Sequence, residues 1–318
     1  MRREGQLSAV QGAVLVARDG SVLHEAYHGL ADLVTDAPVT DQTRFQIASV
    51  SKQFTAAAVL LLCQDGLLSP GDGVTRWFPR CPRSWERITV HHLLTHTSGL
   101  GHWPDYRWVT QTSWEDSDRL VEAFYETPPH TAPETEWCYS SPGYVLLAKI
   151  VERAAGVPYP EFLQRRLFVP LGMENSSAGT PVPPADLAQG HDGAAATRRM
   201  DLDVLYRGAG DVWSTACDLL RWDSALANGS FLSEASRSLM FTPHARTGAG
   251  AEDQYGYGWA LGRLAGHHAR YHTGDNPGFR AINASLTDLD VHVVVLSNQE
   301  RTDPHRAATD LLLATVLN

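Results

Sequence analysis

The sequence predicts a mixed α/β (α+β) fold, in which an antiparallel sheet built from both ends of the chain is flanked by helices. Three observations predict it. Strand-like alternation occurs near the amino terminus, it returns after Tyr255, and the segment between has the apolar spacing of helices. We therefore expect residues 1–76 and 211–318 to form one α/β lobe, and residues 77–210 to form an inserted, mainly helical lobe.

The first elements are a strand pair and a helix. Residues 13–17 and 21–27 have strand composition and flank an Asp-Gly dipeptide, which is a strong signal for a hairpin turn. An extended approach over residues 43–48 then leads to an Ala- and Leu-rich run at 53–62. We expect this run to be a buried helix.

The same periodicities predict the later elements. Apolar residues recur at helical spacing in several segments that Pro or Gly delimit, and period-two alternation marks the late strands. The expected helices are 89–95, 114–125, 142–155, 159–168, 211–228, 233–240 and 311–316, and the expected late strands are 255–261, 268–272, 279–286 and 291–297.

The composition is that of an acidic globular protein. Of the 318 residues, 43% are apolar and 19% are charged, and the formal net charge is -10. This charge and the absence of a Lys/Arg run argue against nucleic acid as a partner. The length allows one large domain or two lobes, and it leaves the oligomeric state open.

We expect a cytoplasmic protein with no membrane partner. Two basic residues near the amino terminus are not followed by the apolar core of a signal sequence. The longest apolar stretch, residues 56–63, is far shorter than the roughly 20 residues that span a bilayer. Four scattered cysteines without C-x-x-C spacing predict reduced thiols, and no motif calls for a cofactor.

The strongest chemical signal is the S-x-x-K sequence of Ser49 and Lys52. Residues three apart share a helix face, so the Lys52 amine can reach the Ser49 hydroxyl and act as the base that a free serine lacks. The alternative is a helix N-cap at Ser49 and a solvated lysine in the first turn. A buried helix directly after the pair favours the catalytic interpretation, because it would hold both side chains rigidly.

Two further motifs follow in order along the chain. Tyr139 and Ser141 stand immediately before an expected helix, and His272, Thr273 and Gly274 end a late strand. With S-x-x-K, they resemble the three motifs of the penicillin-recognising serine enzymes, in particular class C β-lactamases, D-aminopeptidases and related esterases. The phrases LLTHTSGL at residues 93–100 and PLGM at 170–173 look like structural signatures of that family.

This resemblance implies a β-lactamase/transpeptidase-like fold and acyl transfer through an acyl-enzyme on Ser49. It implies that Tyr139 shares the proton transfers with Lys52, and that the backbone N–H groups of Ser49 and Asp275 hold the oxyanion. Neighbouring positive charge favours the phenolate and partial burial favours the neutral amine, so we expect Lys52 and Tyr139 to titrate as a coupled pair.

Two departures from the family pattern bear on the substrate. His272 stands where the third motif usually has a lysine that favours a substrate carboxylate, and histidine is mostly neutral at pH 7. Ser141 stands where the second motif usually has an asparagine that binds an acylamino group. Both departures argue against penicillin or a D-Ala-D-Ala peptide, and versions of the third motif with histidine look like those of esterases and acyltransferases.

We therefore expect a serine hydrolase or acyltransferase that acts on a small-molecule ester or amide, such as a secondary metabolite. Water, an alcohol or an amine would be the acceptor, since the sequence does not separate hydrolysis from transfer. One alternative is a β-lactamase, D-Ala-D-Ala carboxypeptidase or D-aminopeptidase. Another is a non-catalytic binding protein with this fold, but such a protein would normally have lost Ser49, Lys52 or Tyr139.

Two groups of residues near the LLTHTSGL phrase invite other roles. Trp103, Tyr106 and Trp108 are candidates for lining an acyl pocket, and ordinary packing of a loop between lobes is at least as good an interpretation. His92 and His96 are four apart on an expected helix face, next to His91. A third metal ligand is not evident, so we expect no metal site.

Overall fold

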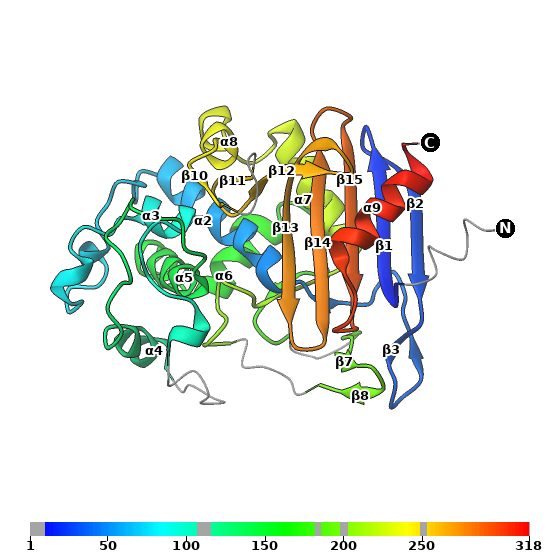
Figure 1. The fold of residues 1–318 in the computed structure, drawn as a ribbon, viewed down its shortest axis with the longest axis horizontal. Coiled ribbons are helices and arrows are strands. Elements are labelled where there is room, and N and C mark those ends of the chain that lie inside the picture. The colour runs from blue at the N-terminus through cyan, green and yellow to red at the C-terminus, as the bar shows by residue number, and fades with distance from the viewer. Residues whose placement is uncertain (1–9, 107–115, 182–185, 198–202, 249–252, 318) are drawn as a thin grey trace.

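The computed structural model describes residues 10–106, 116–181, 186–197, 203–248 and 253–317. Among these residues the largest sheet has eight strands, in the order β10-β11-β12-β13-β14-β15-β1-β2, and its neighbouring strands are antiparallel (Figure 1). The strands of both chain ends thus form one sheet, as the sequence predicted. They are β1 (Gly12–Arg18), β2 (Ser21–His28), β10 (Ala245–Arg246), β11 (Gln254–Tyr255), β12 (Ala260–Leu264), β13 (His267–Asn276), β14 (Phe279–Leu286) and β15 (Val291–Ser297).

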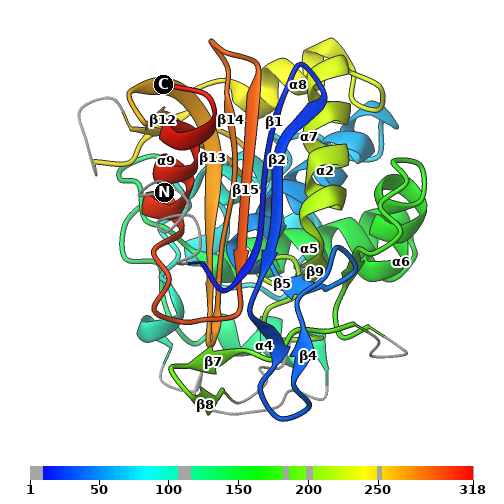
Figure 2. The same cartoon turned by 90° about the vertical axis from the view of Figure 1, so that its right-hand side faces the viewer.

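Both faces of this sheet are covered by helices (Figure 2). Successive residues of β1 point to opposite faces. Val14 packs in a cluster with α9 (Pro304–Thr315), whereas Leu15 packs in the main core with α2 (Ser51–Gln64) and α7 (Ala216–Asn228). Burial on both faces explains why β1 and β15 are nearly continuous apolar runs, although alternation was expected for β15.

The helical part of the molecule packs against α2, which lies between it and the sheet (Figure 1). Its longest helix, α5, runs beside α2, and α3 and α6 contact α5 in turn. The helices are α3 (Val90–Thr95), α4 (Ser117–Phe124), α5 (Ser141–Ala155) and α6 (Tyr159–Leu163), which continues into a π-helical turn, η5 (Gln164–Phe168); α8 (Glu234–Phe241) follows α7.

Short strands and single turns complete the described part. The strands pair as β3 (Leu30–Asp32) with β4 (Ala37–Pro38), β5 (Phe45–Gln46) with β9 (Val212–Ser214) and β6 (Ser177–Ala178), and β7 (His191–Asp192) with β8 (Ala195–Ala196). The 3-10 turns are η1 (Ala48–Val50), η2 (Val74–Arg76), η3 (Arg83–Trp85) and η4 (Trp103–Asp105).

Two expected elements are interrupted in the structure, and the closing helix that was expected at 311–316 begins earlier, at Pro304. A helix over 211–228 was expected, but its first residues form β9, because Trp213 pairs with Gln46 of β5 and the helix begins only after the N-cap Thr215. A continuous strand over 255–261 was expected, but it is broken between β11 and β12. Gly258 has a positive φ of 77° there, and a Cβ on it would lie 2.6 Å from the Lys52 carbonyl oxygen.

The division into lobes at residues 76/77 and 210/211 stays a prediction. The small sheet β5-β9-β6 joins strands from both predicted lobes. Its strand β5 directly precedes, along the chain, the turn that carries Ser49. The expected helix start at residue 114 lies outside the described residues. None of the helices in the described ranges has the length and apolarity that crossing a bilayer requires.

Candidate active site

Ser49 lies in the 3-10 turn η1, which leads directly into α2. Ala48 has a positive φ of 49°, and this turns the chain from the extended β5 segment into the helix. The N-cap of α2 is Val50, and no side chain caps this end, so the Ser49 hydroxyl is not engaged in capping. Residues 51–62 are all buried, which holds the start of the helix rigidly in the core.

The Lys52 amine contacts three oxygen atoms. Its Nζ lies 2.9 Å from Ser49 Oγ, 3.2 Å from Ser141 Oγ and 2.7 Å from the Ala209 carbonyl oxygen. Burial lowers the pKa of Lys52 well below its ordinary value, and the charge of Asp211 raises it again only in part. A neutral amine has two N–H groups, which can donate to the oxygens of Ala209 and Ser141. Its lone pair is then directed at the hydroxyl proton of Ser49.

Tyr139 reaches the same point from the loop before α5. Its side chain hydrogen-bonds with the hydroxyls of Ser49 and Ser141, and the Lys52 amine lies 5.0 Å from the centre of its ring. We expected the lysine charge to favour the phenolate, and this was wrong. Burial raises the pKa of Tyr139 above its ordinary value, and its hydrogen bonds with Ser49 and Ser141 oppose this only in part.

The end of β13 forms the opposite wall of the site. A Cβ on Gly274 would lie 2.1 Å from the Ile47 carbonyl oxygen, so only glycine lets this strand approach the turn that carries Ser49. Thr273 and Asp275, on either side of Gly274, line the same pocket as Ser49. The structure therefore brings the backbones of Ser49 and Asp275 to one pocket, as the expected oxyanion site requires.

His272 is held in its neutral form within β13. Its Nδ1 lies 2.6 Å from the Thr273 carbonyl oxygen, which only accepts, so Nδ1 carries the proton. Its Nε2 therefore accepts from the hydroxyl of Tyr255, 2.9 Å away. Burial, and after it the proximity of Lys52, lowers the pKa of His272 to about 3. This side chain presents no positive charge to a substrate at neutral pH.

These groups surround a pocket of about 330 Å³. The predicted residues Ser49, Tyr139, Ser141, His272, Thr273, Asp275 and Trp103 all line it, and so do four residues that we had not predicted: His102, Tyr206, Ala209 and Asn276. Gly274 lies behind the lining. Tyr106 is not among the lining residues but is buried against Phe124, so the packing interpretation holds for it. Trp108 lies outside the described residues.

The unpredicted lining residues come from three separate parts of the chain. Asn276 donates to Gln46 Oε1 at 2.9 Å and to the Gly210 carbonyl oxygen at 3.1 Å, which ties β13 to the loop that holds Lys52. His102 Nδ1 accepts from the Ser141 amide at 3.3 Å, and burial lowers its pKa to about 4. No local sequence pattern predicts a role for Asn276 or His102, because each contacts partners that are distant along the chain.

The three histidines near the start of the helical part do not converge. The expected pairing of His92 and His96 on one helix face was wrong, because α3 ends at Thr95 and His96 is its left-handed C-cap. The rings of His91, His92 and His96 contact different groups, namely Tyr257 Oη at 2.7 Å, Glu134 Oε1 at 3.0 Å and the Ser140 amide at 3.1 Å. Across the described ranges, no three His, Cys, Asp or Glu side chains are grouped to hold a metal ion.

A family model described as Beta-lactamase matches residues 2–317. The chain belongs to this family. It is 32% identical to penicillin-binding protein 4* of Bacillus subtilis, over 96% of this chain and 71% of that protein. It is 33% identical to esterase EstB of Burkholderia gladioli, over 80% of this chain and 74% of that protein.

A solved structure shows the same fold along the chain. The penicillin-binding protein of Bacillus halodurans superposes with a TM-score of 0.85 and 25% identity, over 99% of both chains. The resemblance drawn from the three motifs is therefore confirmed at the level of family and fold. The β-lactamase family contains both penicillin-binding proteins and an esterase among these relatives, so membership alone does not choose the substrate.

Proposed function

We propose that this protein is a serine hydrolase that forms an acyl-enzyme on Ser49 from a small-molecule ester or amide. One observation carries the proposal. The Lys52 amine is buried, has a lowered pKa, and lies 2.9 Å from the Ser49 hydroxyl with its other contacts satisfied by Ser141 and Ala209. A base must be within reach of the proton it takes and must be able to lose its own proton; Lys52 is within reach, and burial favours its unprotonated form.

The reaction then follows from the positions of these groups. Ser49 Oγ attacks the carbonyl carbon while its proton moves to Lys52 Nζ, and the backbone N–H groups of Ser49 and Asp275 stabilise the resulting oxyanion. Each such donor contributes about 3 kcal/mol to a transition state of this kind. Collapse breaks the bond to the leaving group, which receives the proton through Tyr139. In the second half water attacks the acyl carbon and gives a proton to Lys52 Nζ. The bond between this carbon and Ser49 Oγ then breaks, Ser49 takes the proton back from Lys52, and the acid leaves. An alcohol or amine that takes the place of water makes the protein an acyltransferase.

The lining of the pocket favours an uncharged acyl group. Both lining histidines are neutral, with the pKa of His272 at about 3 and that of His102 at about 4. Trp103 and Tyr206 form an aromatic wall with ring centres 5.5 Å apart. The Asp275 carboxylate points outward and pairs with Arg280 at 2.7 Å. The described lining therefore contains no lysine or arginine that could pair with a substrate carboxylate. This favours neutral esters over penicillins, which carry a carboxylate.

The proposal is tested with p-nitrophenyl butyrate, a fluorophosphonate probe and nitrocefin. We expect butyrate ester turnover, covalent labelling by the probe, and a kcat/KM for nitrocefin at least about 100-fold below that for the ester. Ser49→Ala should abolish turnover and labelling. The control is Ser51→Ala, which removes a neighbouring hydroxyl that accepts from the Val212 amide, and this variant should keep both turnover and labelling. Equal labelling of the Ser49→Ala protein would sink the assignment of the nucleophile.

A further inference from the structure

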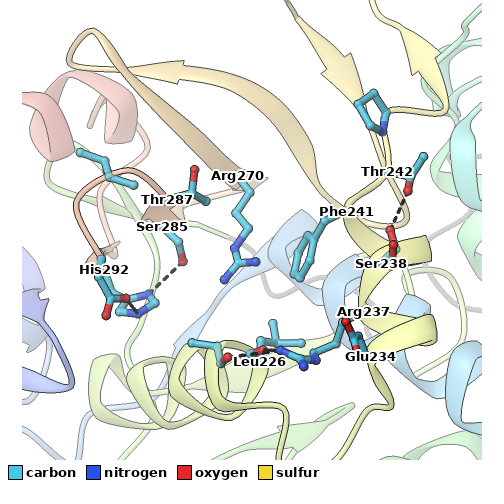
Figure 3. Close-up of a pocket in the computed structure, with 14 residues that line it drawn as sticks. Leu226, Glu234, Arg237, Ser238, Phe241, Thr242, Arg270, Ser285, Thr287 and His292 are labelled. Atoms are coloured by element: carbon cyan, nitrogen blue, oxygen red, sulfur yellow. Dashed lines mark hydrogen bonds and ion pairs between the residues drawn. The ribbon is translucent and has the colours of Figure 1, made fainter.

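A second pocket, of about 630 Å³, lies between α7, α8 and the strands β13 to β15 (Figure 3). It shares none of its lining residues with the pocket around Ser49. The two also differ in charge, because two arginines, Arg237 and Arg270, line the second pocket. A cavity of this volume is large enough for a small-molecule ligand.

Arg270 extends into this pocket from β13. It belongs to a cross-strand row with Ser285 of β14 and His292 of β15, on the sheet face toward α7. Its guanidinium carbon lies over the Phe241 ring, 4.0 Å from the ring centre, and Figure 3 shows the side chain pointing into the space above α7. Among the described residues it has no hydrogen-bond acceptor and no ion pair within 4.0 Å, and its Nε is buried.

Arg237 borders the same space from α8. Its Nη1 donates to the carbonyl oxygens of Leu226 and Ala227, at 3.3 and 3.2 Å, in the last turn of α7. These two bonds fix the orientation of the guanidinium, while its buried Nε has no partner in the described part of the chain. The two arginines are close enough to repel, since Arg237 is one of the groups that lower the pKa of Arg270, after burial itself.

The carboxylates nearby form no ion pair with either arginine, although the charges of Asp223 and Asp290 partly oppose the lowering of the Arg270 pKa by burial. Glu234 and Asp290 stand exposed at the rim, and neither forms an ion pair with either arginine. The buried Asp223 accepts from Asn283 Nδ2 at 3.0 Å, lies 3.7 Å from His292 Nδ1, and has its pKa raised to about 6 by burial. The half-buried Arg270 guanidinium, which lacks an acceptor, is therefore unfavourable without a ligand, because a desolvated charge needs a hydrogen-bonded partner.

We propose that this pocket binds a small molecule that carries a phosphate or sulfate group, with the oxyanion between Arg237 and Arg270. Guanidinium groups bind such oxyanions through paired N–H donors, and the contact with the Phe241 ring helps to position one of them. The hydroxyls of Ser238 and Thr287 line the pocket as further donors. Phe241 and Leu226 offer an apolar surface for the rest of the ligand, so a phosphate or sulfate monoester fits better than the free ion.

Calorimetric titration with phenyl phosphate, phenyl sulfate and inorganic phosphate tests the proposal. We expect saturable binding of at least one monoester to the wild type, tighter than that of inorganic phosphate, and the preferred monoester identifies the oxyanion. Arg270→Gln and Arg237→Gln should each weaken binding about tenfold or more, since charge-assisted hydrogen bonds are lost. The control Arg306→Gln removes an exposed arginine on α9, where it pairs only with Asp310 of the same helix, and should leave binding unchanged.

Two further measurements separate this site from the catalytic one and from a structural role. Ser49→Ala should bind the monoester as the wild type does, so failure of the proposed hydrolase activity would leave this result standing. A crystal of the wild-type protein soaked in the monoester should show the oxyanion between the two arginines. A soaked crystal in which only water joins Arg270 to Asp223, or equal binding by all arginine variants, overturns the proposal.

Discussion

At the scale of single residues, a buried carboxyl near the nucleophile opposes the effect of burial on the pKa of its base. Asp211 Oδ1 accepts from the Gly208 amide at 2.9 Å, in the loop whose Ala209 carbonyl contacts the Lys52 amine. Burial raises the pKa of Asp211 to about 7, so the carboxyl is partly charged near neutral pH. Its charge in turn raises the pKa of Lys52, against the larger effect of burial.

We therefore predict that Asp211→Asn shifts the acid limb of the kcat/KM profile to lower pH. Asparagine keeps an oxygen for the Gly208 amide but removes the negative charge, so the pKa of Lys52 falls further and the amine stays unprotonated in more acidic solution. The measurement is p-nitrophenyl butyrate hydrolysis across pH. The control is Asp223→Asn, which changes an equally buried carboxyl outside the pocket around Ser49. It should leave the acid limb of the kcat/KM profile at the same pH. A shift to higher pH contradicts the argument.

At the scale of elements, the site exists because β13 approaches the turn η1 at the beginning of α2. This approach is possible only at Gly274, where a Cβ would lie 2.1 Å from the Ile47 carbonyl oxygen and 3.1 Å from the Ala48 Cβ. The carbonyl is backbone and the Cβ is the side chain of Ala48, and both belong to fully buried residues that cannot move aside without disturbing the core. The distance between the Ser49 and Asp275 backbones thus depends on a single missing methyl group.

Gly274→Ala should accordingly reduce kcat/KM by about 100-fold, because an oxyanion donor displaced by about 1 Å no longer meets the developing charge. The midpoint of thermal unfolding should also fall. The matched control is Gly71→Ala, since the nearest atom to a Cβ at Gly71 is Ser69 Oγ at 3.9 Å and its backbone has no positive φ. Ester hydrolysis and thermal unfolding are measured for both. Wild-type activity in Gly274→Ala would show that β13 does not set the geometry.

At the scale of the whole molecule, the sheet buries polar groups on the face toward α7 as well as apolar ones. Asn283 of β14 donates to Gln53 of α2 and to Asp223 of α7, at 3.1 and 3.0 Å, and so joins sheet and both helices in the core. Burial raises the pKa of Asp223 to about 6, and the neighbouring His292 and Asn283 oppose this in part. The folded protein therefore favours the protonated carboxyl.

This has a predictable effect on stability. The pKa of Asp223 is higher in the folded protein than its ordinary value of 3.8, so its contribution is fully present below pH 3.8 and is lost as pH rises through about 6. Relative to the wild type, Asp223→Asn should gain stability between pH 4 and pH 7, on the order of 3 kcal/mol. Urea unfolding at both pH values measures the difference. The exposed Asp41→Asn is the control, and a difference independent of pH contradicts the prediction.

The sequence alone determined the local features of this protein. Hairpin chemistry, apolar periodicity and turn residues predicted the strands of both chain ends and most helices, because these signals act between residues close along the chain. The S-x-x-K pair could be interpreted for the same reason, since Ser49 and Lys52 are one helical turn apart. The three motifs also indicated the family, which the comparison with known proteins confirmed.

Only the tertiary structure decided what surrounds these motifs. Asn276, His102 and Tyr206 line the site, and the Tyr255 hydroxyl holds His272 neutral, through contacts between segments far apart in the sequence. The protonation of Tyr139 was also out of reach of the sequence, because burial outweighed the expected effect of the lysine charge, whereas the expected lowering of the Lys52 pKa by burial agrees with the structure. A pKa depends on how completely a group loses water, and the packing of the whole chain determines that loss.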